Sequence, residues 1–116
     1  MIRYFLLLFI LCFNIAFLSG QSDADSYLSD ADELLSKAKI SEALKQYAKA
    51  DSLFSIEENW EQKYKAVYGS MYCQLRLGNG QKMSKGLDNA IPEAAKRLGP
   101  SHLILANLYY LKTIHS

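Results

Sequence analysis

Apolar residues recur at three- and four-residue steps through most of residues 23–111, and no long stretch alternates apolar and polar residues as a strand would. Spacing of this kind places apolar side chains on one face of an α-helix. The pattern breaks at polar segments such as Gly78-Asn79-Gly80, which are typical of turns. The sequence therefore predicts an all-α fold. We expect helices over residues 23–37, 60–77 and 81–98, another that begins after Ser41 and a fifth after Ser101.

The ends of these helices carry their own signals. Ser22, Ser41 and Ser101 each precede an apolar-periodic segment, where a serine hydroxyl can accept a backbone hydrogen bond as an N-cap. Pro92 lies inside the fourth pattern and is expected to kink or break that helix, because it lacks an N–H. The connection between the first two helices is short, which predicts antiparallel neighbours.

The first twenty residues have the composition of a secretory signal peptide. Arg3 precedes a long apolar run, and Ser19 and Gly20 are small residues suited to a cleavage site. We expect cleavage after Gly20 and a helical domain over residues 21–116 that is periplasmic or secreted. A retained membrane anchor is the alternative, although the run is shorter than a usual span. Cleavage removes Cys12, and the remaining Cys73 is expected in the core.

Small and aromatic residues recur in the second predicted helix as Ala43, Tyr47 and Ala50, and an apolar pattern like it returns about 40 residues later around Ala90. With Ala31 in the preceding helix, this segment resembles the tetratricopeptide repeat. In that family small residues stand where the two helices of a unit cross closely. The resemblance implies antiparallel helix pairs stacked as a short solenoid, here two pairs and the first helix of a third.

The junction at residues 98–110, LGPSH followed by LANLYY, is similar to the longer repeats of kinesin light chains and many bacterial proteins. In bacteria such repeats often precede a CHAT-type peptidase domain or a sensor kinase. The resemblance therefore implies either a protein- or peptide-binding scaffold or the N-terminal regulatory part of a larger enzyme. The chain has no catalytic domain of either kind.

The fifth predicted helix has no second helix of its own to pack on. Repeat arrays usually end in a helix with a polar outer face, which this helix lacks. Three explanations stay open: the chain is a fragment of a longer protein, a second copy covers the helix in a small self-associating protein, or a partner covers it.

Motifs for catalysis, metal binding or nucleotide binding are missing from the sequence, which has neither HExxH, CxxC, a Walker loop nor GxGxxG. We expect no enzymatic activity, no cofactor and no metal in this chain. The net charge of +1 argues against nucleic acid as a partner. The charge is uneven, however: residues 21–58 carry nine acids and four lysines, and residues 59–116 carry three acids and eight bases.

In the resembled family, the first helix of each unit lines a concave groove that holds a protein or peptide. The resemblance implies a partner-binding groove on the first, third and fifth helices, and Tyr and Arg are common among residues that dominate binding energy. Aromatic residues at this spacing can equally pack in the core. The predicted groove residues are Asp25, Asp32, Lys65, Tyr68, Tyr72, Arg76 and Asn107.

Overall fold

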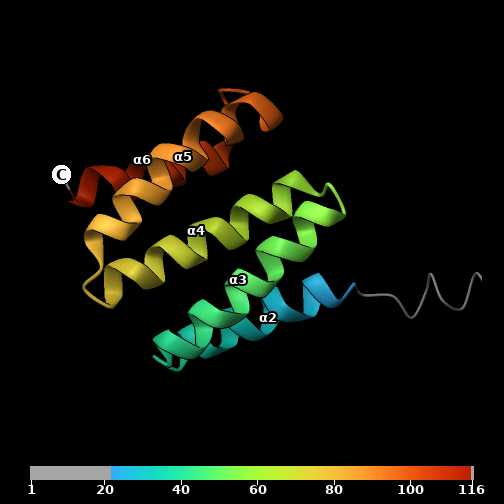
Figure 1. Ribbon diagram of the computed structural model, residues 1–116, viewed down its shortest axis with the longest axis vertical. Helices are drawn as coiled ribbons and strands as arrows, with labels where there is room; N and C mark the ends of the chain where they lie inside the picture. Colours follow the sequence, from blue (N-terminus) through green and yellow to red (C-terminus); the bar gives the residue numbers. More distant parts are fainter. Residues whose placement is uncertain (1–21, 116) are drawn as a thin grey trace, which may run out of the picture.

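The computed structural model describes residues 22–115, and the chain there is almost entirely helical (Figure 1). Its helices are α2 (Asp23–Ser36), α3 (Ile40–Ile56), α4 (Trp60–Arg76), α5 (Gly80–Leu98) and α6 (Leu103–His115). These residues include no strand, so the predicted all-α class is confirmed. The predicted signal peptide at residues 1–20 lies outside the described part of the chain.

The first three connections are the same turn, repeated at an interval of 20 residues. Each contains one residue with a positive φ: Ala38 (60°), Glu58 (57°) and Gly78 (81°). In each, the N–H before the next helix donates to a carbonyl five positions back: Lys39 to Leu34 (2.9 Å), Asn59 to Phe54 (3.0 Å) and Asn79 to Gln74 (2.8 Å). These bonds satisfy carbonyls that the end of a helix leaves free. The chain therefore reverses sharply and by the same geometry three times.

This turn geometry explains where the prediction for the start of α3 is wrong. α3 begins at Ile40, and Lys39 occupies the cap position without a side-chain hydrogen bond, so Ser41 is not the N-cap. Because the Lys39 N–H is already held by the preceding helix, the chain enters α3 at once. The predicted cap of α2 is confirmed, since the Ser22 hydroxyl accepts a hydrogen bond from the Asp25 N–H at 3.3 Å.

The predicted break at Pro92 and the predicted Ser101 cap, both near the C-terminus, are also wrong. α5 continues through Pro92 without a break, and Ile91 and Ala94 beside it are buried. Their packing holds the helix across the one missing hydrogen bond. At the start of α6, the Ile104 N–H donates to Nδ1 of His102 at 3.2 Å, so the accepting side chain is His102 and not the predicted Ser101.

The core has an alanine-rich N-terminal part and a C-terminal part of larger side chains. Ala31, Ala43 and Ala50 are fully buried, as predicted for positions where α2 and α3 cross closely. Cys73 is buried beside them, which confirms its predicted place in the core. The C-terminal part is built around the buried residues Tyr64, Val67, Met83, Leu87, Leu108 and Leu111.

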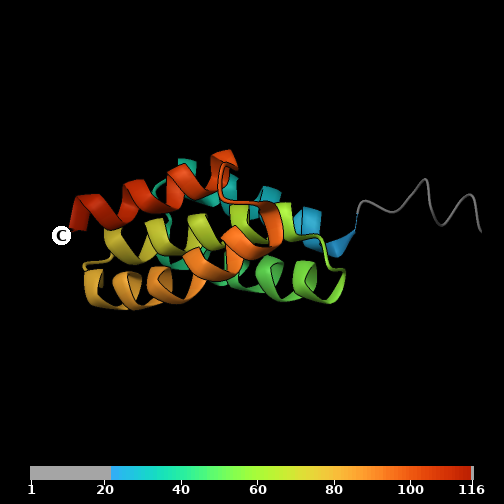
Figure 2. The same ribbon diagram turned by 90° about the horizontal axis from the view of Figure 1, so that it is seen from above.

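The helices pack mainly on their neighbours in the chain. α2 contacts α3 and α4, while α6 contacts α5 and α4. Seen from above, α3 and α5 lie along one edge and α2 and α6 along the other, with α4 between (Figure 2). Within residues 22–115, no helix combines the length and apolar character needed to cross a bilayer.

Candidate functional site

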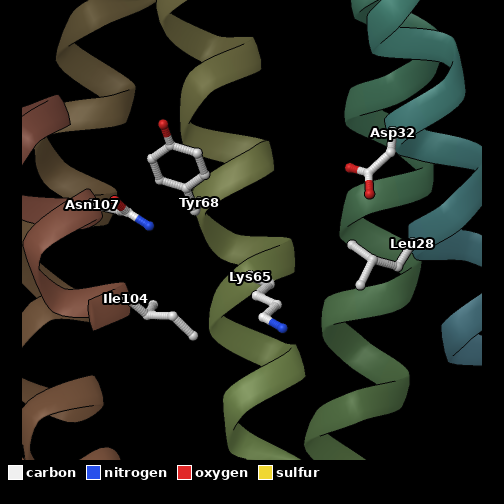
Figure 3. A pocket seen from close by; sticks show the side chains of 6 residues that line it. All are labelled: Leu28, Asp32, Lys65, Tyr68, Ile104 and Asn107. Atoms are coloured by element: carbon white, nitrogen blue, oxygen red, sulfur yellow. The ribbon is translucent and has the colours of Figure 1, made fainter. Parts of the chain in front are cut away.

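A cavity of about 230 Å³ lies between α2, α4 and α6 (Figure 3). Leu28 and Asp32 line it from α2, Lys65 and Tyr68 from α4, and Ile104 and Asn107 from α6. We call this cavity the groove pocket. It brings together residues that are up to 79 positions apart in the chain, because α4 contacts both α2 and α6.

Four of the predicted groove residues line this pocket: Asp32, Lys65, Tyr68 and Asn107. Ile104 lines it too and was not among the predicted groove residues. In the structure Leu103 is 74% exposed and Ile104 only 5%. The signal for the correct face was the pair Ile104 and Leu108, four residues apart in a helix that begins at Leu103.

The other three predicted residues lie outside the lining. Asp25 belongs to the capped first turn of α2, where Ser22 Oγ lies 3.3 Å from its carboxylate. Arg76 donates from Nη1 to the Tyr72 hydroxyl at 3.1 Å, and its guanidinium lies 5.7 Å from the centre of that ring. Tyr72 is half-buried and packs against the C-terminal core. These two side chains therefore engage each other rather than the pocket.

The carboxylate of Asp32 is held in place by the second helix of its pair. Tyr47 on α3 is 2% exposed, and its hydroxyl donates to Oδ1 of Asp32 at 2.5 Å. Burial, and then this bond to a carboxylate, raise the pKa of Tyr47 above its ordinary range, so the hydroxyl keeps its proton and remains a donor. Within residues 22–115 Asp32 has no ion pair within 4.0 Å.

Lys65 is the other charged group of the pocket, and its charge is partly countered. Its Nζ lies 3.9 Å from Oε1 of Glu61, one helical turn earlier, and both side chains are about half exposed (47% and 55%). Exposed pairs of this kind are weak and leave both side chains free to move. The pocket therefore contains one positioned carboxylate and one ammonium group in a weak, half-exposed ion pair.

Hydrogen bonding and charge pairing are the chemistry available to the pocket. Tyr68 and Asn107 supply a hydroxyl and an amide, and Leu28 and Ile104 supply apolar walls at either side (Figure 3). In the described part of the chain no three His, Cys, Asp or Glu side chains gather as metal ligands. The arrangement suits recognition of a side chain or a peptide segment.

Comparison with known proteins found no family model, no curated protein and no solved structure that matches the chain. The resemblance to tetratricopeptide repeats therefore stays an expectation drawn from the residues at 31–50 and 98–110.

Proposed function

We propose that this protein is an exported scaffold of the tetratricopeptide-repeat type that holds a segment of a partner protein or peptide in the groove pocket. The observation that carries the proposal is the pocket itself. It lies between the first helices of the successive pairs, and Asp32, Lys65, Tyr68 and Asn107 line it. Those helices are the ones expected to line the groove if the chain stacks as a short solenoid.

Regular connections between the helices support the repeat architecture. The three turns at an interval of 20 residues each contain one positive-φ residue and one hydrogen bond to a carbonyl five positions back, as successive repeats would. Repeat proteins are built in this way, with each unit packing on its neighbours. The buried alanines at 31, 43 and 50 agree with the close helix crossing that the family resemblance implies.

Export is supported by the sequence of residues 1–20 alone, with its basic start, apolar run and small-residue exit. Cys73, the one cysteine left after the predicted cleavage, is buried in the core beside Ala31, Ala43 and Tyr47.

Site-specific photo-crosslinking in the producing cells tests the groove. Tyr68→p-benzoylphenylalanine puts the crosslinker in the pocket, and Ser52→p-benzoylphenylalanine puts it on the exposed surface of α3. We expect a discrete adduct from position 68 that is absent from position 52 and is lost when Asn107→Ala is added. Equal adducts from both positions, or none from position 68, would contradict the proposal.

Self-association is a second candidate, favoured by the exposed apolar face of α6. Leu103, Tyr110 and Ile114 lie on one face of this helix and are 74%, 62% and 50% exposed. Large exposed apolar side chains in a row are typical of an interface. Sedimentation velocity over a range of concentrations tests it, and a monomer mass at every concentration would rule it out. Tyr110→Lys, which keeps the helix but adds a charge to this face, is the matching variant.

A further inference from the structure

We infer that the groove pocket recognises a lysine or arginine side chain of the partner segment, with the cationic group at Asp32 and the aliphatic stem between Leu28 and Ile104. The inference rests on the proposed function and names the chemistry of what the groove holds. Three observations carry it: the positioned carboxylate, the apolar walls beside it, and the balance of charge around the pocket.

The Asp32 carboxylate is oriented and has a second oxygen that can accept a hydrogen bond from a cation. One oxygen of Asp32 is occupied by the Tyr47 hydroxyl, which fixes the orientation of the group from a buried position on α3. Its charge has no cation within 4.0 Å in the described part of the chain. A group that is already held in its binding geometry loses little entropy when a ligand arrives. Hydrogen bonds between a cation and a carboxylate are the stronger kind.

Apolar side chains line the two facing walls of the pocket, one beside this carboxylate and one across from it. Leu28 lies one turn before Asp32 on α2, and Ile104, only 5% exposed, faces them from α6 (Figure 3). Lysine and arginine place a chain of methylene groups behind a charged end, and such stems pack on apolar surface while the charge stays hydrated or paired. A pocket with apolar walls and one carboxylate complements this shape of side chain.

The remaining charges around the pocket favour the same occupant. Lys65 would repel a cation, but Glu61 lies 3.9 Å from its ammonium group, and the side chain is 47% exposed and free to swing away. An acidic side chain in the pocket would have to displace Glu61 from Lys65, and the charge of Asp32, unpaired among the described residues, would repel it. α6 adds no charged side chain to the lining, only Ile104 and the neutral amide of Asn107. Residues 21–58, which include the α2 wall, carry nine acids and four lysines, so the α2 side of the pocket, where Asp32 lies, attracts a basic group.

Peptide selection followed by a coupling measurement tests the inference. A random peptide library is selected on the purified protein, and the best binder is synthesised with each of its residues replaced in turn by norleucine or glutamate. Norleucine keeps an aliphatic stem and removes the charge. Dissociation constants are measured by fluorescence anisotropy with the parent protein, with Asp32→Asn and with the matched control Asp30→Asn. Asp30 is exposed on the same helix and lies outside the pocket lining.

We expect one basic residue of the peptide whose change to norleucine weakens binding to the parent protein and to Asp30→Asn by about tenfold. The same change should have almost no effect on Asp32→Asn, because the partner charge is already gone. Asn at position 32 can still accept the Tyr47 hydrogen bond, so unchanged thermal unfolding of Asp32→Asn shows that the fold is retained.

The two proposals fail in different ways. If binding is lost with Tyr68→Ala or Asn107→Ala but requires no basic residue, or requires an acidic one, the inference is wrong and the groove function stands. If no selected peptide depends on Tyr68 or Asn107, the proposed function fails and the inference fails with it. A basic residue that matters equally to the parent protein and to Asp32→Asn also overturns the inference.

Discussion

The ring of Tyr47 on α3 lies directly against the backbone of Gly69 on α4, with no room for a β-carbon between them. A β-carbon built at position 69 would overlap three atoms of that ring. Tyr47 is 2% exposed and its hydroxyl is bound to Asp32, so the ring has little freedom to move aside. The glycine therefore sets how closely α3 and α4 approach.

Gly69→Ala should lower the free energy of unfolding by about 1–3 kcal/mol, because the added methyl group overfills a packed contact. Gly86→Ala is the matched control in a helix. Its β-carbon would meet only the end of the flexible Met71 side chain, with Sδ at 2.6 Å. The better helix propensity of alanine, about 1 kcal/mol, then offsets the displacement. Urea unfolding of both variants measures the difference, and equal losses would show that the Tyr47 contact is not limiting.

Tyr64→Phe is expected to leave stability unchanged or raise the free energy of unfolding by about 1 kcal/mol. The Tyr64 side chain is 1% exposed, and its hydroxyl is buried without a hydrogen-bond partner among the described residues. Removing an unsatisfied buried hydroxyl relieves a desolvation cost. Tyr47→Phe serves as the contrast, because it breaks the bond to Asp32 and should cost about 1 kcal/mol. Thermal and urea unfolding should rank Tyr64→Phe above the parent and Tyr47→Phe below it; the reverse order would contradict the structure.

The free energy of unfolding should fall in alkaline solution, because Tyr64 ionises there. Burial, with the Glu93 carboxylate nearby, raises the pKa of Tyr64 from 10.0 to about 12. As the pH rises, the unfolded chain therefore loses the Tyr64 proton before the folded protein does, which favours unfolding. The free energy of unfolding keeps its full contribution from Tyr64 below pH 10 and loses it as the pH rises toward 12. Burial shifts the pKa of Tyr47 in the same direction.

Urea titrations across this pH range should therefore give a shallower decline for Tyr64→Phe than for the parent protein. The exposed Tyr109 offers a control, and Tyr109→Phe should follow the parent curve. Identical slopes for all three proteins would mean that the Tyr64 hydroxyl is not buried in solution.

Cys73 should react slowly with thiol reagents in the folded protein. The side chain is fully buried, and burial raises the pKa of its thiol, which reduces the reactive thiolate. In a Cys12→Ser variant, which leaves Cys73 as the single thiol, labelling with a disulfide reagent at neutral pH should be at least about tenfold slower than in urea. Equal rates would place the thiol at the surface.

Helix positions and buried residues were predictable because they depend on local periodicity. The all-α class, the turn at Gly78 and the burial of Ala31, Ala43 and Cys73 all followed from spacing and residue size. The start of α3 did not, because the bond from Lys39 to Leu34 overrides the capping preference of Ser41. The break predicted at Pro92 is absent for a similar reason, since tertiary packing holds α5 together where proline lacks an N–H.

The groove was predictable in part. Asp32, Lys65, Tyr68 and Asn107 line one pocket because α4, which carries two of them, contacts both α2 and α6. Arg76 and Tyr72 lie outside because they bind each other, which spacing alone cannot distinguish from binding a ligand. The bond from Tyr47 to Asp32 joins different helices 15 positions apart, and nothing in the local sequence indicates it.

α4 is the one helix of the described chain that contacts every other: α2, α3, α5 and α6. Within residues 22–115, α2 and α6 share no contact of their own, so a shift of α2 reaches α6 only by moving α4. The same helix supplies Lys65 and Tyr68 to the pocket. A molecule bound there would touch α2 and α6 at once and couple the two helices directly, which the described part of the chain does only through α4.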